Sequence, residues 1–127
     1  MPIRISFEEP DRFVLEGTGA ITGAESIDAF EEVLKHPRFR KGVTLLAVTR
    51  NVTGAPPTDE LREIVSSALA LKKGGMTAMA IVTEPGFTYG VARMFSALAD
   101  LVGVRVEIFQ DVSEAREHLD EASARAA

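Results

Sequence analysis

Apolar and polar residues alternate along two short stretches near the start of the chain. The stretches are residues 3–7 and 13–16, and the turn between them contains a proline and an aspartate. Strict alternation is typical of half-buried strands, and a short turn of this kind joins antiparallel strands. The pattern therefore predicts an opening β-hairpin.

After the hairpin, helical patterns alternate with short apolar runs of strand length. The predicted segments are helices at residues 23–35, 59–73 and 112–122, a loop and helix at residues 85–102, and strands at residues 43–49, 77–83 and 104–109. Thr22 with Glu25 fits a capping box, and Thr58 is expected to cap the second helix. Strands separated by helices are parallel neighbours joined by right-handed crossovers. The sequence thus predicts an α/β fold, with a mixed, mainly parallel five-stranded sheet that starts with a β-hairpin, and four helices, in the order β-β-α-β-α-β-α-β-α.

The glycines at positions 17, 19 and 23 lie between the second predicted strand and the first helix. Their spacing differs from that of a dinucleotide-binding loop because the third glycine falls one residue late. We therefore expect them to bend the strand or to relieve a close contact.

The length and composition predict one soluble domain. With 127 residues, the chain is expected to form a single domain over residues 1–122, followed by a frayed C-terminal tail at residues 123–127. The absence of cysteine excludes disulfides and thiolate metal sites, and a net charge of −5 argues against nucleic acid as a partner. No apolar run has the length of a membrane span, and the start is not a signal peptide. We expect a cytoplasmic protein with no stable membrane insertion.

Few residues are suited to catalysis. The two histidines, His36 and His118, lack a metal-type partner three or four residues away, and no nucleophile or phosphate-loop motif is present. We expect no enzyme, no metal and no cofactor. The alternative is a small carboxylate-based enzyme that uses Glu84 or Asp59.

Positive charge gathers in residues 33–58, which contain five basic residues and no acidic one. One interpretation is a solvated loop between a helix and a strand. The other is a docking patch for an acidic partner or a phosphate, since a basic stripe on an acidic protein attracts anions.

The helix within residues 85–102 has two distinct faces. One is expected to pack inward and carries Val91, Met94, Phe95, Leu98, Leu101 and Val102, whereas the opposite face carries Tyr89, Arg93, Ser96 and Asp100. The flanks between these faces are glycine and alanine. The polar face is either a solvated surface or, because small flanks allow close approach, a subunit interface or a ligand site.

The element order, the stretch Phe87-Thr88-Tyr89-Gly90-Val91-Ala92-Arg93-Met94 and the segment from Phe109 to Leu119 resemble SpoIIAA-like, or STAS-type, domains. The resemblance is to a small stand-alone bacterial branch that shares its fold with CRAL-TRIO lipid-binding domains. It implies mostly non-enzymatic roles in regulation or ligand sensing. The anti-sigma-factor antagonists of this fold carry a phosphorylated serine in an Asp-Ser-Ser-Gly motif. The matching stretch, Arg50 to Thr58, has only Thr53-Gly54 in common with it, so the phosphoswitch is not carried over.

Together these features predict a non-catalytic binding or regulatory module. Its site is expected at the carboxyl edge of the sheet, between the Arg50–Thr58 loop and the Pro85–Arg93 helix start, because open α/β sheets bind ligands at this edge. The predicted partner is a protein or a small anionic or lipid-like, amphipathic ligand. The alternative is a homodimer without a small-molecule ligand. The residues expected to bind the ligand or partner are Arg50, Thr53, Thr58, Tyr89, Arg93 and Ser96, with Arg93 contributing most.

Overall fold

The computed structural model describes residues 2–126 and contains the predicted order of strands and helices. The elements are β1 (Ile3–Glu8), β2 (Arg12–Ala20), α1 (Gly23–Lys35), β3 (Thr44–Gly54), the 3-10 turn η1 (Thr58–Glu60), α2 (Leu61–Gly74), β4 (Ala78–Val82), α3 (Phe87–Leu101), β5 (Val106–Phe109) and α4 (Val112–Ala126).

The five strands form one sheet in which the spatial order follows the chain, β1-β2-β3-β4-β5. β1 and β2 are antiparallel, and every later neighbour pair is parallel. The predicted fold class is therefore confirmed: an α/β fold with a mixed, mainly parallel sheet that opens with a hairpin.

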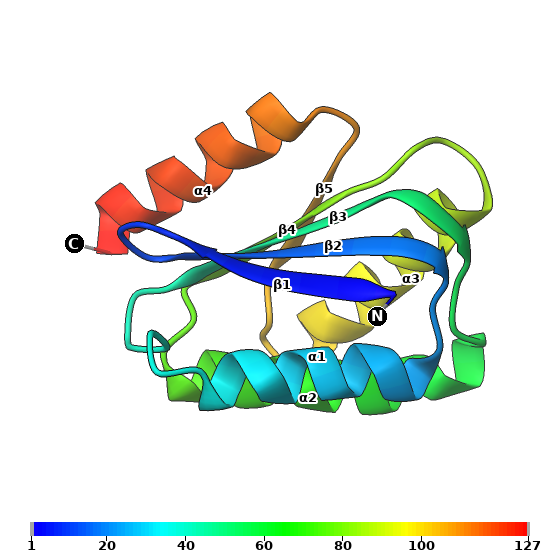
Figure 1. Cartoon of the computed structure of the whole chain (residues 1–127), viewed down its shortest axis with the longest axis horizontal. Coiled ribbons are helices and arrows are strands. Elements are labelled where there is room, and N and C mark those ends of the chain that lie inside the picture. The colour runs from blue at the N-terminus through cyan, green and yellow to red at the C-terminus, as the bar shows by residue number, and fades with distance from the viewer. Residues whose placement is uncertain (1, 127) are drawn as a thin grey trace.

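The helices cover the two faces of the sheet unequally. α1, α2 and α3 lie on one face and α4 lies alone on the other (Figure 1). Adjacent residues of β3 pack on opposite faces of the sheet. Leu45 belongs to the core under the three helices, and Leu46 belongs to the smaller core under α4. Both side chains are fully buried. This explains why β3 is apolar without alternation at its start, as expected for a strand covered on both faces.

Two predicted boundaries on either side of the β3–α2 connection are wrong. β3 continues through Gly54, so Arg50 and Thr53 lie in a strand and not in a loop, because this part of β3 pairs with the end of β2 from Thr18 to Ala20. Thr58 starts η1 and does not cap α2 with its side chain, since the N-cap position of α2 is Glu60.

The start of α1 agrees with the prediction, whereas the end of α4 differs from it. The capping box of α1 is confirmed, with the Glu25 amide donating to Thr22 Oγ1 at 3.1 Å and the Thr22 amide donating to Glu25 Oε1 at 2.8 Å. At the other end of the chain, α4 continues to Ala126, so residues 123–126 are helical where a tail was expected. Ala127 lies outside the described residues.

α3 is rotated relative to the prediction. Its buried side chains are Ala92, Phe95 and Ala99, whereas Met94, Leu101 and Val102, which were expected to pack inward, are exposed. The small alanines allow the helix to approach the sheet closely. The hydroxyl of Ser96, which was expected on the outer face, donates to the Val106 carbonyl of β5 at 2.7 Å and fixes this rotation.

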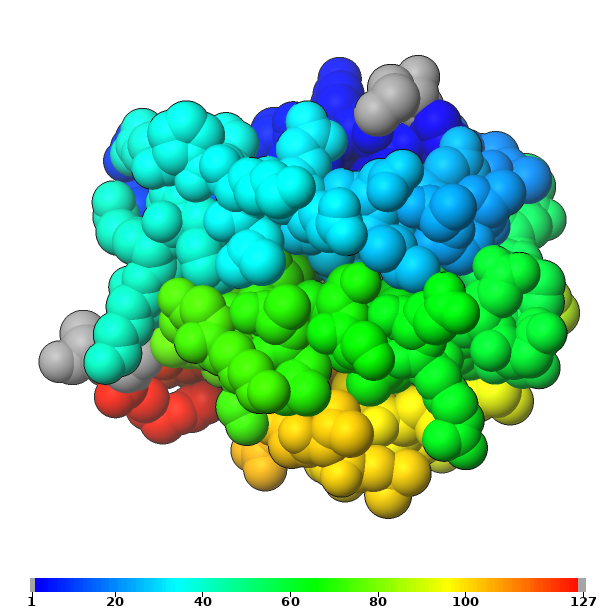
Figure 2. All heavy atoms as spheres, turned by 90° about the horizontal axis from the view of Figure 1, so that it is seen from below, coloured from blue at the N-terminus to red at the C-terminus, as the bar shows by residue number. Residues whose placement is uncertain are grey.

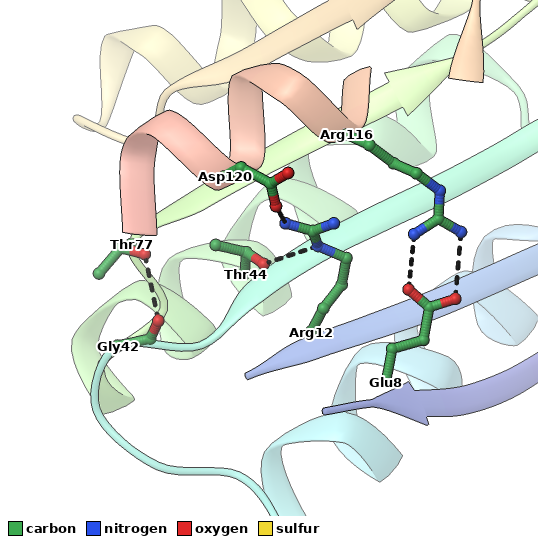
Figure 3. Close-up of polar contacts among 7 residues, drawn as sticks. All are labelled: Glu8, Arg12, Gly42, Thr44, Thr77, Arg116 and Asp120. Atoms are coloured by element: carbon green, nitrogen blue, oxygen red, sulfur yellow. Dashed lines mark hydrogen bonds and ion pairs between the residues drawn. The ribbon is translucent and has the colours of Figure 1, made fainter. Parts of the chain in front are cut away.

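Ionic contacts join α4 to the opening hairpin, 108 positions away along the chain (Figure 3). The buried Arg12 guanidinium donates to Asp120 Oδ1 at 2.6 Å and to Thr44 Oγ1 at 3.3 Å. Arg116 donates to both carboxylate oxygens of Glu8, at 2.6 and 3.1 Å. Such paired bonds to one carboxylate are the geometry that a guanidinium favours.

The burial of Phe95 gives a test of the rotation of α3. Replacing Phe95 with alanine should lower the free energy of unfolding by about 3–5 kcal/mol, because it removes a buried aromatic ring. Val102→Ala, at an exposed position of the same segment, should cost less than about 0.5 kcal/mol. Urea denaturation of both variants measures the difference, and equal losses would show that the burial of α3 is wrongly assigned.

The Glu8–Arg116 pair makes stability depend on pH. The hydrogen bonds from Arg116 hold the pKa of the Glu8 carboxyl below its usual value of 4.5, against a smaller opposing effect of burial. Because the folded pKa is the lower one, the pair stabilises the protein above about pH 4.5, and this contribution is lost as the pH falls through the folded pKa.

Glu8→Gln should therefore lower the free energy of unfolding at pH 7 by about 0.5–1 kcal/mol, a value reduced by solvent screening of this half-exposed pair. At pH 2 the cost should vanish. Urea denaturation at the two pH values measures this, with Glu31→Gln on the exposed face of α1 as the control. A cost of equal size at both pH values would contradict the ionic origin.

Candidate functional site

A cavity of about 160 Å³ opens at the carboxyl edge of the sheet, on the face covered by three helices. Its walls come from the ends of β2, β3 and β4, the start of α1, the β3–α2 connection and the first turns of α2 and α3. The lining residues are Ile3, Leu15, Gly17, Ile21, Ser26, Ala29, Phe30, Ala47, Val48, Thr49, Val52, Ala55, Pro56, Leu61, Ile64, Ile81, Thr88, Val91, Ala92 and Phe95. The wall is therefore almost entirely apolar, and it contains no lysine, arginine, aspartate or glutamate among the described residues.

The cavity exists because β2 and β3 run further than β4. β4 ends at Val82, which pairs with Val48, while β3 continues for six more residues to Gly54. At the point where β4 ends, the Thr49 hydroxyl donates to the Val82 carbonyl at 2.8 Å. Beyond it, β3 is paired only with β2, and Val52 on this extension closes one side of the cavity.

Gly17 allows this extension to fold over the cavity. A Cβ atom at position 17 would lie 2.9 Å from Val52 Cγ2, closer than two such atoms can approach. The pairing of β2 with β3 is also irregular between Glu16 and Thr18. The prediction that glycines here relieve a close contact and bend a strand is thus confirmed at Gly17.

Three hydroxyl groups are the polar part of the wall. Ser26 donates to the Thr22 carbonyl at 3.2 Å, and Thr49 is bonded to β4 as described. The buried Thr83 hydroxyl lies 3.3 Å from the hydroxyl of Thr88, in the first turn of α3, and 3.2 Å from the Glu84 carbonyl. Because a hydroxyl has two lone pairs besides its proton, Thr88 can still accept a hydrogen bond from a molecule that enters the cavity.

None of the six residues predicted to bind a ligand is among the described lining residues of the cavity. Arg50 and Thr53 are exposed on β3, and Thr58 is exposed at the start of η1. The residues that do line the cavity are close to these three in sequence. They are Thr49 and Val52 on β3, and Pro56 before η1. The predicted edge of the sheet is where the cavity lies.

Tyr89, Arg93 and Ser96 lie together on α3, away from the cavity. The Arg93 guanidinium is 5.9 Å from the centre of the Tyr89 ring, one turn earlier on the helix. Arg93 and Ser96 line a separate polar groove between α3 and β5, with Asp100, Arg105 and Glu107. Binding by these three residues stays a prediction.

The lining residues of the extension, Val52 above all, were missed because the strand was ended at Thr49. A signal was present, since Asn51-Val52-Thr53 continues the alternation of polar and apolar residues that marks a half-buried strand. Gly17 and Ile21 also line the cavity, and their place in its wall depends on the pairing of β2 with β3. That pairing lies between residues about 33 positions apart, and local patterns do not reveal it.

The basic residues of segment 33–58 are spread over both edges of the sheet. Arg38 pairs with Glu9 and lies 4.5 Å from the centre of the Phe7 ring, while Arg40 donates to the Pro10 carbonyl. These contacts join the segment before β3 to the hairpin turn, at the edge away from the cavity. Only Arg50 lies beyond the start of β3.

Residues 2–126 offer no arrangement for metal binding. No group of three or more His, Asp or Glu side chains in this part of the chain is arranged to hold a metal ion. None of the helices described there is both long and apolar enough to cross a bilayer. Glu84 and Asp59 are exposed, and neither lines the cavity.

The fold matches a known structure along nearly its whole length. An uncharacterized protein of the DUF3478 family from Shewanella loihica PV-4, described as having a SpoIIAA-like fold, superimposes with a TM-score of 0.58. The match covers 92% of this chain and 91% of the other, at 16% sequence identity. This chain has a SpoIIAA-like fold. The fold implied by the sequence resemblance is therefore confirmed, while no protein-family model and no curated protein matches the sequence.

The close approach of Gly17 to Val52 can be tested by a double-mutant cycle. Gly17→Ala should destabilise the protein by about 1–3 kcal/mol, because the added methyl group displaces Val52. In a Val52→Ala background the same change should cost much less, since the atom that it meets is gone. Urea denaturation of the four proteins measures the coupling. Additive losses would show that the two positions are not in contact.

Proposed function

We propose that the protein is a non-catalytic binding or regulatory module whose cavity takes the apolar part of a small amphipathic ligand. The observation that carries this proposal is the cavity itself, about 160 Å³ of apolar space that opens at the carboxyl edge of the sheet. A dry cavity of about 150 Å³ lined by Leu, Ile and Phe is large enough to bind benzene. One ring or a short alkyl chain is therefore the group that fits.

The position of the cavity supports the same proposal. In open α/β sheets, ligands bind outside the carboxyl ends of the strands. Ligand sites are mostly apolar with a few well-placed polar groups, and here the Thr88 hydroxyl is such a group. It supports an alcohol hydroxyl at the end of the apolar chain, which would donate to Thr88.

The chemistry of the wall favours binding over catalysis. The lining residues of the described chain include no carboxylate, histidine or cation, whereas acid–base catalysis needs a titratable group within reach of the substrate. Because the wall carries no cation, a negative charge on the ligand should add little to its affinity. We therefore place the ligand's charge, if it has one, outside the cavity in solvent.

A chain-length series tests the proposal. Straight-chain alcohols from butanol to decanol should bind with an affinity that rises roughly fourfold per methylene group, because each buried methylene contributes about 0.8 kcal/mol. The rise should stop when the cavity is full. Amide chemical shifts in NMR titrations give the affinities, and the largest shifts should lie on β3 and at the start of α3.

Two variants locate the binding site. Ala47→Leu adds bulk to the cavity wall and should weaken octanol binding by about tenfold or more. Ala70→Leu makes the same change at an exposed position of α2 and should leave affinity unchanged. Octanoate should bind no more tightly than octanol. Failure of every alcohol to shift cavity residues, or equal effects of the two variants, would refute the proposed site.

A further inference from the structure

Within the described residues, the exposed large hydrophobic side chains all lie along α3 and at its C-terminal end. Among residues 2–126, the large hydrophobic side chains that are exposed are Phe87 at 70%, Met94 at 45%, Leu101 at 80% and Val102 at 45%. All of them belong to α3 or to the residue after it. Clustered exposed apolar side chains mark interaction sites, whereas single ones scattered over a surface do not.

Three of these side chains follow a regular spacing. Phe87, Met94 and Leu101 are seven residues apart, and the exposed small residues Gly90 and Ala97 lie between them at intervals of three and four. We call these five residues the α3 seam. Spacing of three and four in alternation is the pattern by which two helices pack against each other along a seam. Small residues at two of the five positions let the helix axes approach closely.

The α3 seam is on the outside of the molecule. Figure 2 shows α1, α2 and α3 side by side on the three-helix face, with α3 at the rim. The cavity is lined by Thr88, Val91, Ala92 and Phe95 from another face of this helix. One helix therefore carries the cavity wall on one side and the unpartnered seam on another.

One positive and one negative side chain lie beside the seam, so they can pair with the opposite charges on a second copy of the chain. Arg93 and Asp100 are exposed, two turns apart, and flank the same side of the seam. Within residues 2–126 neither of them forms an ion pair. If two copies of α3 lie antiparallel, Arg93 of each copy meets Asp100 of the other. In a parallel pair, by contrast, the two copies of this flank lie on opposite sides of the seam, so Arg93 and Asp100 of one copy do not meet those of the other.

We propose that a second copy of this chain docks on the α3 seam, with the two α3 helices antiparallel about a two-fold axis that crosses the seam between Met94 and Ala97. Met94 of each copy then packs on Ala97 of the other, and Gly90 packs opposite Leu101. A contact of this kind uses the same surface on both subunits and closes as a dimer. It leaves the cavity open and is independent of the ligand-binding proposal.

The charge pattern allows a sharp test of both the surface and the orientation. Wild-type protein should be dimeric in sedimentation velocity and native mass spectrometry. Arg93→Asp and Asp100→Arg should each raise the dimer dissociation constant about tenfold or more, because each places like charges opposite one another at both ends of the seam. An equimolar mixture of the two variants should form a heterodimer, since its charges are again opposite, and the double variant should form a homodimer.

Controls separate this outcome from loss of folding. Arg62→Asp, at an exposed site on α2, should leave the dimer unchanged. Met94→Glu should abolish the dimer while circular dichroism and unfolding of the monomer stay as in the wild type, because this side chain is exposed within one chain. Restoration in the mixture also shows that each charge variant is folded.

Three results would overturn the proposal. One is a wild-type protein that stays monomeric at hundreds of micromolar. Another is a dimer that persists in Met94→Glu or that the charge variants weaken without recovery on mixing. The third is a monomer that binds phosphatidylcholine vesicles through Met94, which would assign the seam to a membrane surface.

Discussion

The central strands of the sheet must be covered on both faces, and the rest of the architecture follows from how the four helices are distributed between these faces. β3 and β4 carry apolar residues on both sides, so a single layer of helices would leave one side in water. Three helices cover one side and α4 alone covers the other (Figure 1). α4 is held over the hairpin by Arg116 and by Asp120, which meet Glu8 and the buried Arg12.

On the face covered by three helices, the strands of the sheet end at different points. β2 and β3 extend past the end of β4, and the first turns of α1, α2 and α3 surround this extension. An apolar space remains there because Ala29, Ala47 and Ala92 carry no side chain large enough to fill it. Larger residues at these three positions would reduce the volume of the cavity. At Gly17, by contrast, an added methyl group would meet Val52, so glycine is needed there for the close approach of β2 to β3.

Much of the fold was predictable because its signals are local. The hairpin, the capping box of α1 and the apolar run that begins β3 each depend on residues within a few positions of one another. The resemblance carried by residues 87–94 and 109–119 identified the SpoIIAA-like fold that the structural match confirms.

The rotation of α3 was not predictable from its own sequence. The apolar residues of α3 form a wide band, and the helix buries only the part of it that includes Phe95. What selects the buried part is the neighbouring strand, through Ser96 and the Val106 carbonyl, and the small size of Ala92 and Ala99. For the same reason the predicted residues are neighbours in sequence of the residues that line the cavity, and not the lining residues themselves. The direction of Val52 and Thr88 depends on contacts between distant segments.

The order of the strands has a consequence for how the chain is made. Because the spatial order of the sheet is the order of synthesis, each strand that leaves the ribosome finds its neighbour already present. Contacts between nearby segments also cost little loop entropy, and topologies rich in them fold quickly. The exception is α4, whose ion pairs with the hairpin join residues 108 positions apart. α4 is synthesised after all five strands and is joined to the hairpin by these ion pairs, so a chain cut before α4 leaves the apolar residues beneath it, Leu46 and Ala80 among them, exposed to water.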